Sequence, residues 1–134
     1  MPIGEKAFEE KSKNEIPFIE SANSKDRTLL TFSSEVEGFG RWPSGTIIGS
    51  GEERIGPDGK ARSEWHGLWS TREGDFIRWT GSDRTTGLGQ ADKGVMLMRF
   101  HTTSERLKWM NKVVVMEEHA GTVQRFSGIG YEWQ

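Results

Sequence analysis

Apolar and polar positions alternate along most of this chain, and the alternation is strongest in residues 61–81. In an extended chain, Trp65 and Trp69 fall on one face of this stretch and His66 falls on the other. A glycine-bearing turn at residues 72–74 separates two such runs, and this pattern predicts a β-hairpin. Only one face of the hairpin can line a core, so either the tryptophans or the histidine point inward. The sequence leaves this choice open.

The same alternation predicts further strands, joined by turns rich in glycine, proline and polar residues. We expect strands at residues 3–13, 27–37, 46–54, 61–71, 75–81, 95–102, 112–118 and 123–133. A short helix is the alternative for the first of these segments. We expect an irregular link at residues 14–25, a tight turn at residues 56–59 and a long polar loop at residues 83–94.

About eight consecutive strands without a long helix predict an all-β fold. Ser104 can cap one helical turn, and Leu107 and Met110 are three positions apart, so we expect that turn near residues 104–110. The expected arrangement is an antiparallel up-and-down barrel of about eight strands, because closure removes exposed sheet edges. A chain of 134 residues predicts a single β-barrel domain over residues 1–134. The interior of such a barrel is filled with side chains or holds one small ligand.

Composition narrows the classes of partner and site. Hydrophobic residues make up only 33%, but 17 glycines and six tryptophans fit an ordered barrel with bent strands. The net charge of −2, with both signs interspersed, does not indicate nucleic-acid binding. The absence of cysteine excludes disulfides, thiolate metal sites and cysteine nucleophiles. Since no apolar leader and no stretch of about 20 apolar residues is present, we expect a cytoplasmic protein without a membrane partner.

Two histidines are the first candidates for chemistry. If their strands are neighbours, His66 and His101 point into one cavity, where a histidine can act as a general acid or base. The alternative is that both are hydrogen-bonded or face solvent. Arg99 shares the face of His101, and an inward Arg99 would need a partner such as Glu117, because an unpaired buried charge is costly. A salt bridge at the rim or on the outer face is the alternative for this pair.

Aromatic residues are the second group of candidates. The tryptophans can line a cavity for a small molecule or fill the core. The face with Met96, Met98 and Phe100 suits a core or a contact between subunits. No metal-binding spacing and no nucleotide-binding fingerprint is present, so we expect no metal and no cofactor. The candidate ligand-binding residues are Trp65, His66, Trp69, Arg78, Trp79, Arg99, His101 and Glu117.

The order of the predicted elements resembles the allene oxide cyclase-like barrels, a calycin-type group that includes the dirigent proteins. Over residues 38–133, a glycine-rich meander leads to the segment ERLKWMN at residues 105–111, a valine-rich strand and a final Tyr131-Glu132-Trp133. Lys112 follows Asn111 where the group has glycine. The layout is most similar to small uncharacterised bacterial and archaeal members. The resemblance implies the barrel fold and no catalytic residue.

We therefore expect the barrel to bind a small, largely apolar molecule. A cofactor-independent cyclase or isomerase with an acid/base pair is the first alternative. An oligomeric structural domain is the second, and a homo-oligomer is compatible with all three. A cavity lined by His66 and His101 favours the first two functions, whereas a filled interior with an apolar contact between subunits favours the third.

Overall fold

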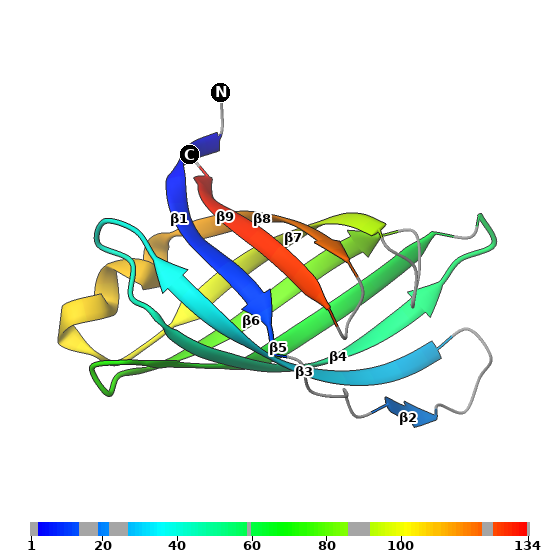
Figure 1. The fold of residues 1–134 in the computed structure, drawn as a ribbon, viewed down its shortest axis with the longest axis horizontal. Helices are drawn as coiled ribbons and strands as arrows, with labels where there is room; N and C mark the ends of the chain where they lie inside the picture. The colour runs from blue at the N-terminus through cyan, green and yellow to red at the C-terminus, as the bar shows by residue number, and fades with distance from the viewer. Residues whose placement is uncertain are drawn as a thin grey trace.

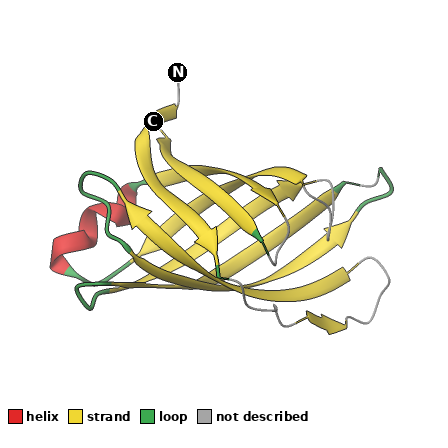
Figure 2. Cartoon of the chain, viewed as in Figure 1, coloured by secondary structure: helices red, strands yellow, loops and turns green. Residues whose placement is uncertain are grey.

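β-Strands dominate the computed structural model, which describes residues 3–13, 19–21, 27–58, 60–85, 92–121 and 125–133 (Figure 2). The elements in chain order are β1 (Ile3–Ser12), β2 (Ile19–Ser21), β3 (Arg27–Gly38), β4 (Gly45–Ile55), β5 (Ala61–Thr71), β6 (Phe76–Thr85), β7 (Asp92–His101), the 3-10 helix η1 (Glu105–Lys112), β8 (Val114–Gly121) and β9 (Phe126–Trp133).

Within the described residues, eight strands, β1 and β3 to β9, close into an antiparallel barrel (Figure 1). From β3 onward each strand pairs with the next one in the sequence, and β1 closes the sheet by pairing with both β9 and β3. The short strand β2 pairs with β3 in addition. The predicted all-β, up-and-down barrel is therefore confirmed, and closure satisfies the strand edges that an open sheet would expose.

Several boundaries differ from the predictions. β2 lies where only an irregular link was expected, although residues 14–18 and 22–26 of that link are outside the described part. The expected loop at residues 83–94 is strand at both ends, and its residues 86–91 are outside the described part. β8 also continues through His119 to Gly121. The strand ends were missed because polar side chains, Asp83 and His119, occupy inward positions there. The helix η1 has eight residues instead of one turn.

Strand alternation divides the side chains of the barrel wall between the interior and the outer surface. In β5, Trp65 and Trp69 are buried, whereas Glu64 and His66, on either side of Trp65, are exposed. The tryptophan face of the predicted hairpin is therefore the inward one. This result settles the choice that the sequence left open.

Aromatic side chains fill the half of the interior next to η1. The ring of Trp42 stacks on Trp69 at 6.3 Å between centroids and meets Phe100 edge-on at 5.6 Å. Leu107 and Met110 of η1 are fully buried, so the helix packs across this end of the barrel (Figure 1). Met96, Met98 and Phe100 also belong to the core, as one of the two interpretations of that face predicted.

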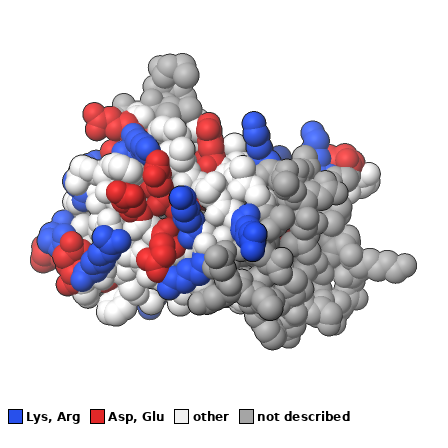
Figure 3. Space-filling model, viewed as in Figure 1, with Lys and Arg blue, Asp and Glu red and all other residues white. Residues whose placement is uncertain are grey.

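The outer surface carries mixed charge. Lys and Arg lie close to Asp and Glu on the described part of the face shown in Figure 3. Examples are the ion pairs Lys13–Glu35 at 3.0 Å and Arg41–Glu132 at 2.7 Å. Among the described residues, no helix is long and apolar enough to span a membrane.

Candidate functional site

Buried polar side chains gather in the half of the interior away from η1. One row of paired positions runs across β4 to β8, and its members are Glu53, Ser63, Asp83, Met96 and Glu117. Each of these side chains is at most 7% exposed. β1 adds Glu10, which is 3% exposed. We call Glu10, Glu53, Asp83 and Glu117 the carboxyl cluster.

Glu10 and Glu117 form the centre of the cluster. Glu117 lies by Gly128 of β9, the pairing partner of Glu10, where an added Cβ would lie 2.8 Å from Cδ of Glu117. The Ser34 hydroxyl donates a hydrogen bond to Glu10 at 2.6 Å. Burial raises the pKa of Glu117 well above its ordinary value, and Glu10 and then Asp83 raise that pKa further. Glu117 therefore keeps its proton at a pH where exposed carboxyls have lost theirs.

Asp83 and His119 form a second pair close to the first. Nε2 of His119 lies 2.8 Å from Oδ1 of Asp83, and the two side chains are 15% and 7% exposed. The imidazole occupies the space over Gly94, where an added Cβ would lie 2.7 Å from Nε2. A carboxylate at one ring nitrogen fixes the orientation of the imidazole, and it leaves Nδ1 as the nitrogen that can accept a proton.

Aromatic rings around Phe32, which we call the aromatic wall, also lie in the interior. The ring of Phe32 meets Trp65 edge-on at 5.3 Å and Phe126 edge-on at 5.4 Å, and it lies 6.0 Å from Trp79. Phe32 and Phe126 are only partly buried. A groove of about 440 Å³ opens beside Phe126, and its lining residues are Lys11, Ser12, Ala120, Arg125, Phe126 and Ser127. Aromatic walls with a few convergent polar groups are typical of small-molecule sites.

Several buried polar atoms of the interior make no hydrogen bond to the described protein. They include Oε2 of Glu117 and the indole Nε1 atoms of Trp42, Trp69 and Trp79. A buried polar group without a partner costs about 1–3 kcal/mol. Native proteins satisfy nearly all such groups, with water or a ligand where the protein does not. The unsatisfied oxygen of Glu117 therefore marks a position where the interior can accept a further polar group.

The predicted ligand-binding residues separate into two groups. Those that point inward are Trp65, Trp69, Trp79 and Glu117, and those exposed on the outer surface are His66, Arg78, Arg99 and His101. The expectation that His66 and His101 share a cavity is wrong, because the strands direct Trp65 and Phe100 inward and turn the adjacent histidines outward. An interior pair of Arg99 with Glu117 is excluded for the same reason, because only Glu117 is buried.

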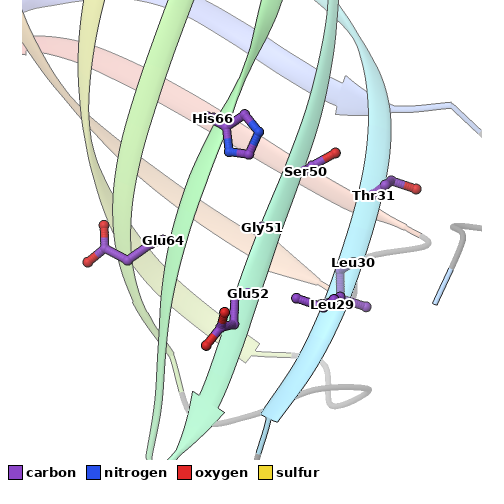
Figure 4. Close-up of a pocket in the computed structure, with 8 residues that line it drawn as sticks. All are labelled: Leu29, Leu30, Thr31, Ser50, Gly51, Glu52, Glu64 and His66. Atoms are coloured by element: carbon purple, nitrogen blue, oxygen red, sulfur yellow. The ribbon is translucent and has the colours of Figure 1, made fainter. Parts of the chain in front are cut away.

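His66 lies instead in a shallow groove on the outer wall (Figure 4). The groove has a volume of about 450 Å³, and its lining residues are Leu29, Leu30, Thr31, Ser50, Gly51, Glu52, Glu64 and His66. Its two carboxylates are engaged elsewhere, since Glu64 accepts a hydrogen bond from Ser82 at 3.1 Å and Glu52 pairs with Arg54 at 2.6 Å. Both carboxylates of this groove therefore have other partners, and His66 is exposed.

Sequence reasoning missed Glu10, Glu53 and Asp83 as interior groups. The inward row of β6 passes through Trp79 and Gly81, so one further step of the alternation leads to Asp83. His119 was not among the predicted ligand-binding residues either. Among the described residues, no group of three or more His, Asp or Glu is arranged to hold a metal ion.

Comparison with known proteins supports the fold. No family model and no curated protein matches the sequence. A protein of unknown function from Clostridium acetobutylicum ATCC 824 has a similar structure, with a TM-score of 0.78 at 17% identity over 97% of this chain and 98% of its own. A β-barrel-like protein from Acinetobacter baumannii AYE gives 0.80 at 15% identity, covering 98% of this chain and 95% of its own.

An enzyme from Penicillium herquei is also similar, with a TM-score of 0.69 at 21% identity, covering 98% of this chain and 96% of its own. Identities this low indicate a shared fold and transfer no activity. The barrel that the resemblance implied is thus confirmed. These neighbours do not assign the chain to the allene oxide cyclase-like group.

Proposed function

We propose that the barrel binds a small, largely apolar molecule in its interior and receives the polar end of that molecule at Glu117. The observation that carries this proposal is the buried Oε2 of Glu117, which makes no hydrogen bond to the described protein. A protonated carboxyl can both donate and accept, so it suits a hydroxyl, carbonyl, amide or amine N–H group. The aromatic wall of Phe32, Trp65, Trp79 and Phe126 supplies apolar contact for the rest of the molecule.

The charge of the interior restricts the ligand further. The carboxyl cluster brings four acidic groups together, and no Lys or Arg is buried among the described residues. An anionic ligand would meet like charges in a region of low dielectric, which is strongly unfavourable. We therefore expect a neutral ligand, or one that carries an amine.

The first test uses N-phenyl-1-naphthylamine, a neutral aromatic probe with a single N–H donor. We expect saturable quenching of tryptophan fluorescence, because Trp65 and Trp79 belong to the wall of the proposed site. Glu117→Leu should weaken probe binding about tenfold through the loss of one hydrogen bond. His66→Ala, on the outer wall, is the control and should bind as the wild type does. Absence of quenching in the wild type, or equal weakening by both substitutions, would rule out the proposed site.

A second candidate function is a cofactor-independent isomerase or cyclase. The observation that favours it is that β8 directs both Glu117 and His119 inward, and that the His119 imidazole is held by the Asp83 carboxylate. In an enolisation, Nδ1 of His119 accepts the proton of a breaking C–H bond while Glu117 donates its proton to the carbonyl oxygen. Return of a proton to carbon completes the exchange with no net oxidation. Structural similarity to an enzyme agrees with this reading and does not establish it.

The enzyme reading is tested by α-proton exchange of 2-tetralone, a neutral apolar ketone, in deuterated water. NMR should show exchange that depends on the protein, and Glu117→Gln should slow it about 100-fold. His101→Ala, on the outer surface, should leave the rate unchanged. Probe binding without any exchange would retain the binding function and exclude this enolisation.

We also propose the cytoplasm as the compartment, which the complete lack of cysteine supports. Membership of the allene oxide cyclase-like group stays a proposal as well. The position of η1 before the valine-rich β8 supports it, as does the barrel itself.

A further inference from the structure

The outer face of β7, β8 and β9 is unusually apolar. Val95, Leu97 and Trp133 are 43%, 46% and 44% exposed. Partly buried apolar side chains lie between them on neighbouring strands. We call the whole set the outer apolar face, and its members are Val95, Leu97, Val114, Met116, Ile129, Tyr131 and Trp133. The pairing of β7 with β8 and of β8 with β9 makes this set contiguous.

The outer face of β5 is different. The outward residues of β5 include Arg62, Glu64 and His66, as expected for a wall that faces water. β7 and β8 also direct apolar residues into the core, among them Met98 and Val115, so both faces of these strands carry apolar side chains. Strands that are apolar on both faces are typical of sheets covered on both sides. An exposed apolar patch with a polar rim marks a surface of association.

Two opposite charges flank the centre of the outer apolar face. One row of paired positions contains Leu97, Met116 and Tyr131. Arg99 lies in the row on one side of it and Glu118 in the row on the other side. Neither charge forms an ion pair with another described residue. A two-fold axis along the central row would place the row with Arg99 of one copy over the row with Glu118 of the other.

We propose that the outer apolar face is the interface of a homodimer, in which Leu97 and Met116 pack on the same residues of a second copy around a two-fold axis. The self-complementary charges favour a second copy over an unrelated partner, because one surface supplies both signs. This interface is separate from the proposed interior site, so either proposal can fail without the other.

The test is sedimentation velocity over a range of protein concentrations. We expect a monomer–dimer equilibrium in the wild type, and Leu97→Glu should raise the dissociation constant about 100-fold or more, because it buries a charge at the centre of the interface. Ile48→Glu is the matched control, since Ile48 is an apolar residue, 52% exposed, on the outer face of β4. Circular dichroism and thermal unfolding check that both variants fold.

Charge reversal tests the proposed symmetry. Arg99→Glu and Glu118→Arg should each weaken the dimer, because each places like charges together twice, and the double variant should restore much of the affinity. A wild type that stays monomeric at about 100 μM would overturn the proposal. It would also be overturned by a dimer that tolerates Leu97→Glu, or by a monomer that binds neutral phosphatidylcholine vesicles through this face.

Discussion

Replacement of Glu117 by glutamine tests whether the barrel interior holds a protonated carboxyl. Glutamine keeps the shape of the side chain and two polar terminal atoms, but it cannot ionise. Glu117 is 3% exposed and lies beside Glu10, which is equally buried. The substitution therefore removes an ionisable group from the carboxyl cluster without opening a cavity.

The sign of the effect follows from the raised pKa of Glu117. In the unfolded chain this carboxyl ionises near its ordinary pKa of about 4.3, whereas in the folded protein it keeps its proton to higher pH. The contribution of protonated Glu117 to stability is fully present below the ordinary pKa, and it is lost as the pH rises through the raised pKa of the folded state. Between the two, the folded state binds one more proton, so the free energy of unfolding falls by about 1.4 kcal/mol per pH unit.

Glutamine at position 117 has no proton to lose, so the stability of Glu117→Gln should not fall with pH through ionisation at this position. The advantage of the variant over the wild type should therefore grow by up to about 1.4 kcal/mol for each pH unit above about 4.3. Urea unfolding followed by tryptophan fluorescence, at intervals from about pH 4 to pH 8, measures both curves. Glu64→Gln is the control, because Glu64 is exposed on the outer wall.

Parallel pH profiles for the wild type and Glu117→Gln would refute the reasoning. They would mean that Glu117 ionises at the same pH in the folded and unfolded states. If the pH profile of Glu64→Gln diverges from the wild type by the same amount, a general charge effect, and not burial, explains the difference in stability.

Two further substitutions test the packing of the interior by urea unfolding. Gly128→Ala should destabilise the fold by about 1–3 kcal/mol, because the new Cβ crowds the carboxyl of Glu117, whereas Ser127→Ala on the exposed neighbour should change stability little. Trp69→Ala should cost about 3–5 kcal/mol by opening a cavity among Trp42, Phe8 and Phe100. Leu68→Ala, at a half-buried position, is the comparison. If Trp69→Ala lowers the free energy of unfolding no more than Leu68→Ala does, the aromatic half is not the core.

Period-two alternation was sufficient to predict the barrel, because each strand needs only one apolar face and a turn at each end. It placed Trp65 and Trp69 on the face opposite His66 but did not identify the inward face. That choice depends on barrel closure, which involves pairings between segments as distant as β1 and β9. Alternation within one hairpin carries no information about those pairings.

The candidate site was predicted only in part. Glu117 and the tryptophans are inward, but Glu10 and Asp83 were overlooked because a buried carboxyl resembles a surface residue in sequence. The interior tolerates them through pairing, Glu10 with Ser34 and Asp83 with His119. Such pairs join residues 24 and 36 positions apart on different strands, so only the folded sheet brings them together.

The most direct test of the interior site is a carbon-detected NMR titration of the glutamate side-chain carboxyls, with and without N-phenyl-1-naphthylamine. The signal of the Glu117 carboxyl is assigned as the one missing from the spectrum of Glu117→Gln. We predict that this carboxyl titrates well above its ordinary pKa and that its signal shifts when the probe binds. If that carboxyl titrates as exposed glutamates do, and its signal is indifferent to a probe that quenches tryptophan fluorescence, Glu117 is not the polar contact of an interior ligand.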